Sequence, residues 1–84
     1  MGASAPQAQL VDAAVRFLRR MGQDYGIVAP PSAITAGPMG TVLIEWQATD
    51  YYFEVEIVAS DRAEWMSQAG DGPAHHGALR IESV

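Results

Sequence analysis

Two segments that alternate apolar and polar residues around Thr49-Asp50 are the feature that most limits the fold of this chain. A two-residue turn there would pair residues 41–48 with 51–58 and bring six large apolar side chains onto one face. Those side chains are Val42, Ile44 and Trp46 in the first segment and Phe53, Val55 and Ile57 in the second. The pattern therefore predicts an antiparallel hairpin. Since Thr49-Asp50 is not one of the common Asn-Gly or Asp-Gly pairs, a longer loop is the alternative.

The segment before the hairpin predicts one helix. Apolar residues recur at helical spacing over residues 5–22 and form a single stripe. The stripe consists of Leu10, Ala14, Phe17, Leu18 and Met21. Ser4 and Gln7 are spaced as in a capping box, and Gly22 is typical of a residue that ends a helix. We expect this helix to lie across the apolar face of the hairpin.

Residues 23–40 predict an extended linker between the helix and the sheet. The segment contains three prolines, and Pro30-Pro31 favours extended backbone. A short edge strand at Ala33–Thr35 is the alternative interpretation of its centre.

Two further strands are expected after the hairpin, at residues 63–68 and 78–84. The glycines and the proline between them predict a loop that includes His75 and His76. With 84 residues the chain has material for one core. We therefore expect a single domain, residues 1–84, of the α+β class, with the N-terminal helix packed on an antiparallel meander of three to four strands in residues 41–84.

Composition narrows the function classes. The net charge is −5, and residues 23–84 carry nine acidic residues against two arginines. An acidic body argues against nucleic-acid binding, which depends on neutralising phosphates. No stretch approaches the roughly 18 apolar residues of a membrane span, and the N-terminus does not resemble a signal peptide. Together with the absence of cysteine, these features predict a cytoplasmic protein.

The polar face of the predicted hairpin is the candidate site. Glu45 would lie directly opposite Glu54, although like charges in such a position cost some tenths of a kcal/mol. The residues expected on this face are Glu45, Glu54, Glu56, Glu64, Tyr52, Leu43 and Met66. Carboxylates mixed with Tyr, Leu and Met are typical of a protein-binding surface that attracts a basic partner. The alternative to a binding surface is a face that only contacts solvent and keeps the chain soluble.

Catalytic and metal chemistry find little support in the sequence. Facing carboxylates can hold a cation, but the dense Asp, Asn and Gly spacing of calcium loops is missing. The adjacent pair His75-His76 is poorly suited to binding one ion. There is no Gly-x-Ser-x-Gly, no phosphate-binding glycine loop and no dinucleotide fingerprint. We expect no cofactor and no enzymatic activity.

The stretch "GTVLIEWQATDYYFEVEI" carries a resemblance to a group of small, mostly uncharacterised bacterial proteins. It is similar to them in the pattern Gly-x-Val-x-x-Glu-Trp followed by Tyr-x-Glu-Val-Glu-Ile, with a helix ahead of the hairpin. It departs from them at residues 38–40, where Pro-Met-Gly replaces an acidic residue and a glycine. The resemblance implies an antitoxin-like or immunity-like partner of another protein and assigns no functional residue.

The sequence therefore predicts a small bacterial protein that binds a basic protein through its acidic sheet face. The first alternative is a homo-oligomeric subunit, in which the apolar residues of that face or the final strand form a homodimer seam. The second alternative is a metal-binding or ligand-binding module.

Overall fold

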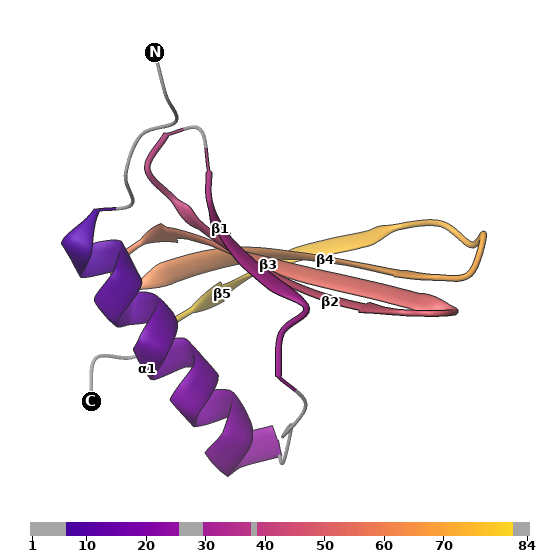
Figure 1. The fold of residues 1–84 in the computed structure, drawn as a ribbon, viewed down its shortest axis with the longest axis horizontal. Helices are drawn as coiled ribbons and strands as arrows, with labels where there is room; N and C mark the ends of the chain where they lie inside the picture. Colours follow the sequence, from indigo (N-terminus) through magenta and orange to yellow (C-terminus); the bar gives the residue numbers. More distant parts are fainter. Residues whose placement is uncertain (1–6, 26–29, 38, 82–84) are drawn as a thin grey trace.

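The computed structural model describes residues 7–25, 30–37 and 39–81. They form one helix, α1, and five strands, β1 to β5, in a single antiparallel sheet whose strand order follows the sequence (Figure 1). The elements are α1 (Ala8–Tyr25), β1 (Ala33–Ala36), β2 (Val42–Ala48), β3 (Tyr51–Ala59), β4 (Arg62–Ala69) and β5 (His75–Arg80). The predicted α+β architecture is confirmed, with one strand more than the expected three to four.

The central hairpin has the predicted register. Strands β2 and β3 are joined by Thr49-Asp50 alone, and Ile44 lies opposite Val55. Val42 pairs with Ile57 in the same way, and Trp46 with Phe53. Three side chains of this face, Ile44, Val55 and Ile57, are completely buried. The apolar residues of the alternation therefore lie on one face of the sheet and the polar residues on the other, because successive side chains on a strand point to opposite faces.

The helix packs its predicted stripe on this face of the sheet. Leu10, Ala14, Phe17 and Met21 of the predicted stripe are buried, whereas Leu18 is only partly buried. Ala13, which was not predicted, is buried beside them. The helix begins at Ala8, where the carbonyl of Gln7 accepts the first amide hydrogen bonds, and the predicted cap Ser4 lies outside the described residues. The expected end at Gly22 is wrong, since the helix continues to Tyr25. A glycine inside a helix costs only about 1 kcal/mol, and no proline follows before Pro30.

The predicted linker over residues 23–40 is wrong in part, because it contains the last turn of α1 and the strand β1. The alternative edge strand at Ala33–Thr35 is confirmed, and β1 pairs with β2 so that Ile34 lies opposite Ile44. A tight turn joins the two strands. In this turn Gly40 has φ of 79°, a conformation that glycine adopts without strain.

The final hairpin begins earlier than the sequence predicted. Strand β5 starts at His75, so the expected loop over residues 69–77 is wrong at its last three positions, and residues 82–84 lie outside the described part. Gly77 pairs with Trp65, and a Cβ atom at Gly77 would come within 2.5 Å of the Trp65 indole ring. Gly77 is therefore a strand residue covered by a large cross-strand neighbour, and not a loop residue.

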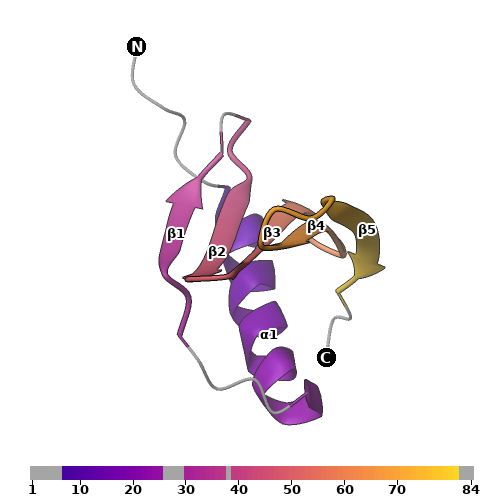
Figure 2. The same cartoon turned by 90° about the vertical axis from the view of Figure 1, so that its right-hand side faces the viewer.

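The helix covers only part of the sheet face on which it packs. In Figure 1 the far ends of β2 to β5 project beyond α1, and Figure 2, viewed from the side of these ends, shows the sheet in front of the helix. Along this face burial is complete at Ile44 and Val55 but only partial at Trp46, Phe53 and Trp65, which lie farther out or on the next strand. We call this projecting part the hairpin arm (residues 46–53 and 65–77) and its helix-side surface the aromatic underside (Tyr51, Trp46, Phe53 and Trp65).

Candidate protein-binding face

The face of the sheet opposite α1 holds all the residues that the sequence predicted for a binding site. Glu45 and Glu54 are direct partners across β2 and β3, and Met66 continues the same row on β4. A second row consists of Leu43, Glu56 and Glu64 on the same three strands. Tyr52 lies one row farther toward the β2–β3 turn, between Gln47 and Gln68. We call this surface the acidic face.

Tyr52 connects the two facing carboxylates. Its hydroxyl lies 2.6 Å from Oε1 of Glu45 and 2.9 Å from Oε1 of Glu54. A hydroxyl carries a single proton, so one bridging group is shared by two acceptors. This contact offsets part of the repulsion between Glu45 and Glu54 and holds both carboxylates in defined positions.

The shared hydrogen bond also changes the acidity of Tyr52. Burial first, and then the hydrogen bonds and charges of Glu45 and Glu54, raise the pKa of the Tyr52 hydroxyl above its ordinary value of 10.0. Each cause disfavours a negative phenolate, because it would lose solvation and face two carboxylates. The hydroxyl is therefore a donor over the whole physiological range.

The raised pKa of Tyr52 predicts a dependence of stability on alkaline pH. In the unfolded chain the tyrosine loses its proton near pH 10, whereas the folded protein keeps it to higher pH. The stabilising contribution is complete below pH 10 and is lost as the pH rises toward the raised pKa. In urea titrations between about pH 9 and pH 11.5, we expect the free energy of unfolding to fall less steeply for Tyr52→Phe than for the wild type.

The neighbouring tyrosine supplies the control for this experiment. Tyr51 lies on the other face of β3, so Tyr51→Phe should keep the wild-type slope. Equal slopes for Tyr52→Phe and the wild type would contradict the proposed contact between the hydroxyl and the two glutamates.

Glu56 is fixed by a different donor. The hydroxyl of Thr41 donates to Oε2 of Glu56 over 2.7 Å, and Thr41 itself is buried. The β1–β2 turn crowds this contact, because a Cβ at Gly37 would overlap the Thr41 hydroxyl. The sequence analysis missed Thr41, which precedes β2 and carries no charge to mark it.

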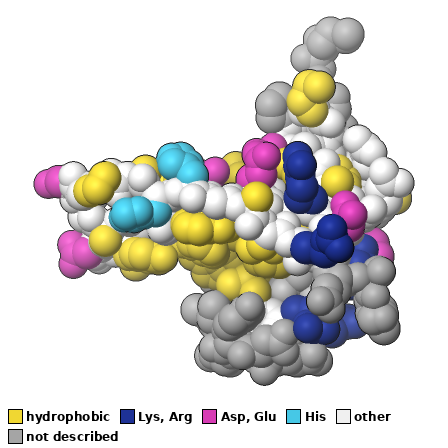
Figure 3. All heavy atoms as spheres, turned by 180° about the vertical axis from the view of Figure 1, so that it is seen from behind, with side chains coloured by type: hydrophobic (Ala, Val, Ile, Leu, Met, Phe, Trp, Pro, Cys, Tyr) yellow, Lys and Arg dark blue, Asp and Glu magenta, His cyan; other side chains and the backbone are white. Residues whose placement is uncertain are grey.

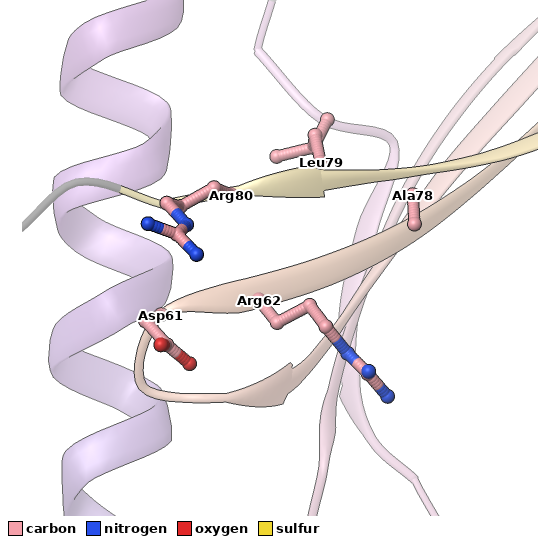
Figure 4. Close-up of a pocket in the computed structure, with 5 residues that line it drawn as sticks. All are labelled: Asp61, Arg62, Ala78, Leu79 and Arg80. Carbon is pink, nitrogen blue, oxygen red and sulfur yellow. The ribbon is translucent and has the colours of Figure 1, made fainter.

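Glu64 lies at the boundary between the acidic face and a basic end. Arg62 approaches Glu64 at 3.9 Å, and both side chains are more than half exposed, so the pair stabilises the fold little. Arg62 also faces Arg80 across β4 and β5. These two arginines line a shallow hollow of about 210 Å³ with Asp61, and Figure 4 shows Arg62 directed away from Arg80.

That hollow is a poor candidate for a small-molecule site. Its volume is below the roughly 300–1,000 Å³ of typical ligand pockets, and its arginines are directed apart. Within residues 7–25, 30–37 and 39–81, no group of three or more His, Asp or Glu side chains is arranged to hold a metal ion. The acidic face is instead an extended surface, which suits contact with another macromolecule.

The histidines are not where the sequence analysis expected them. Both lie in β5, where His76 pairs with Met66 and extends the acidic face, while His75 pairs with Ser67 on the helix side. Gln47 and Gln68 are further members of the acidic face. Neither was among the predicted binding residues, although alternation with Leu43 and Glu45 places Gln47 on that face.

Comparisons with protein-family models, with curated proteins and with solved structures found no match. No helix within the described part of the chain combines the length and apolar character that a membrane crossing requires.

Proposed function

We propose that this protein is a non-catalytic binding module whose acidic face binds a basic surface of another protein. The observation that carries this proposal is the bridge from Tyr52 to Glu45 and Glu54 on a sheet face that no other element of the described chain covers. A surface needed only for solubility gains nothing from carboxylates that are held in place.

The held carboxylates favour binding through pre-organisation. Ordering a free glutamate at an interface costs about 0.5–1.5 kcal/mol of side-chain entropy. Glu45, Glu54 and Glu56 have already lost part of that freedom to Tyr52 and Thr41. The spare oxygens of these carboxylates are the acceptors that an arginine guanidinium recognises in pairs.

The uncharged members of the face provide contact area. Leu43 and Met66 are partly buried beside the glutamates, and they offer apolar surface next to the carboxylates of their rows. Charges would steer the partner, and these apolar groups would limit its dissociation. An antitoxin-like or immunity-like role follows if the partner is an enzyme whose own substrate is anionic, since such an enzyme presents a basic site.

Neutralising the acidic face is expected to abolish capture of a basic partner. We would immobilise the wild type and the triple variant Glu45→Gln, Glu54→Gln, Glu56→Gln, capture partners from a lysate of the native host, and identify them by mass spectrometry. For a captured protein, the triple variant should bind at least about tenfold more weakly in calorimetry. The wild-type affinity should fall as salt is raised.

The matched control removes three charges from elsewhere. Asp50, Asp61 and Asp71 are exposed and lie in turns, so their joint replacement by asparagine changes the net charge by the same amount. This control should bind as the wild type does. If the two triple variants bind equally weakly, net charge and not the acidic face governs the interaction, and if both bind as the wild type does, neither governs it; the proposal fails in both cases.

A further inference from the structure

We propose that two copies of this chain form a symmetric dimer, in which the aromatic underside of each hairpin arm packs on the helix flank of the other copy. This inference concerns the opposite side of the sheet from the acidic face and does not depend on the proposed function.

The aromatic underside is a packed but incompletely covered surface. Trp46 and Phe53 have ring centroids 5.6 Å apart, and Phe53 and Trp65 lie 6.4 Å apart. Near the tip, Tyr51 is 47% exposed. Figure 3 shows hydrophobic side chains gathered beside the two histidines on the projecting arm. A helix is about 10 Å wide, whereas the nine residues of β3 extend about 30 Å, so one helix cannot cover this face.

The helix has a matching apolar flank. Val11 and Val15 are one turn apart and are 43% and 46% exposed, with the partly buried Leu18 beside them. Arg16 donates a hydrogen bond to the carbonyl of Ser60 in the β3–β4 turn, at the end of the sheet remote from the tip of the hairpin arm. At 100° per residue, Val11 and Val15 lie about 100–140° around the helix from Arg16, on the flank directed toward the arm.

Charge favours a second copy as the occupant. A symmetric interface uses one surface on both partners, so that surface must be complementary to itself. The acidic face is less suited, because Glu45, Glu54 and Glu56 at its centre would meet the same glutamates of the other copy. The aromatic underside holds no charged side chain, and the charged neighbours of Val15 on the helix, Asp12 and Arg19, are of opposite sign. Two copies of a chain of net charge −5 can therefore approach there.

The available area is sufficient for a weak dimer. From Trp46 to the turn at Asp50 the arm is about 15 Å long, and its four strands are about 19 Å wide, which gives roughly 300 Å² of underside. Two-fold symmetry uses an arm and a flank from each copy. Each partner would therefore contribute roughly 600 Å², at the lower end of the range for specific interfaces.

The mass of the protein in solution tests this proposal. Size-exclusion chromatography with light scattering at about 100 µM should give about 18 kDa, twice the 9.0 kDa of the chain. Tyr51→Arg on the arm and Val15→Arg on the helix flank should each return the mass to 9.0 kDa. Gln9→Arg, which adds the same charge at an exposed position on the other flank of α1, should leave the dimer intact.

Every other outcome overturns the proposal. A wild type of 9.0 kDa at this concentration excludes the dimer, and a dimer insensitive to both variants uses another surface. Dissociation by one variant alone contradicts the reciprocal arrangement. Circular dichroism confirms that each variant is folded, and two independent variants keep the test decisive if one is not. The triple glutamine variant of the acidic face should remain dimeric, which separates this test from that of the proposed function.

Discussion

Replacing Ile44 with alanine is expected to lower the free energy of unfolding by about 2–5 kcal/mol. Ile44 is 0% exposed and lies in the centre of the face that α1 covers. Truncation would leave a cavity among neighbours that are themselves fixed by the sheet. A domain of 84 residues has a total stability of about 4–13 kcal/mol. This single change should therefore remove a large part of it, which urea denaturation followed by circular dichroism would measure.

The chain contains a matched control for this prediction. Ile34 lies directly opposite Ile44 on β1 but is 55% exposed. Ile34→Ala removes the same atoms from the same row of the sheet and should cost less than about 1 kcal/mol. Similar losses for the two variants would contradict the placement of Ile44 beneath the helix and of Ile34 at the sheet edge.

Adding one methyl group at Gly77 is expected to cost about 1–3 kcal/mol. In Gly77→Ala the new Cβ would come within about 2.5 Å of three atoms of the Trp65 indole, so the ring must move. That movement would also disturb the contact between Trp65 and Phe53. The expected results are a lower urea midpoint and a change in tryptophan fluorescence.

A double-mutant cycle isolates the cause of this effect. In a Trp65→Ala background the ring is absent, and Gly77→Ala should then be neutral or slightly stabilising, because alanine is preferred to glycine in a strand. If Gly77→Ala costs as much in that background as in the wild type, the backbone at Gly77 and not the indole is responsible.

The part of the fold that could be predicted depends on local periodicity. The alternation of apolar and polar residues from Val42 to Ile57 determines both the register of β2 with β3 and the face on which each side chain lies. For the same reason the membership of the acidic face, including Glu45 and Glu54, follows from the sequence. A shift of one residue would have buried the glutamates, so the register was strongly constrained.

The features that could not be predicted depend on contacts between distant residues. Gly77 is typical of a loop by composition, and only the indole of Trp65 explains why it lies in a strand. Similarly, the bridge from Tyr52 to two glutamates requires side-chain geometry that alternation does not specify. The alternation also identifies the face that the helix covers, but it does not specify how far along the strands the helix lies. The exposed aromatic underside was therefore not predicted.

The strand order has a consequence for how the chain folds. Every strand pairs only with its neighbours in the sequence, and the β2–β3 and β3–β4 connections are two residues long. Little loop entropy is lost when such hairpins close. The sheet can therefore form from the hairpin at Thr49-Asp50 by adding one strand at a time. Docking of the helix is then the step that joins residues far apart along the chain.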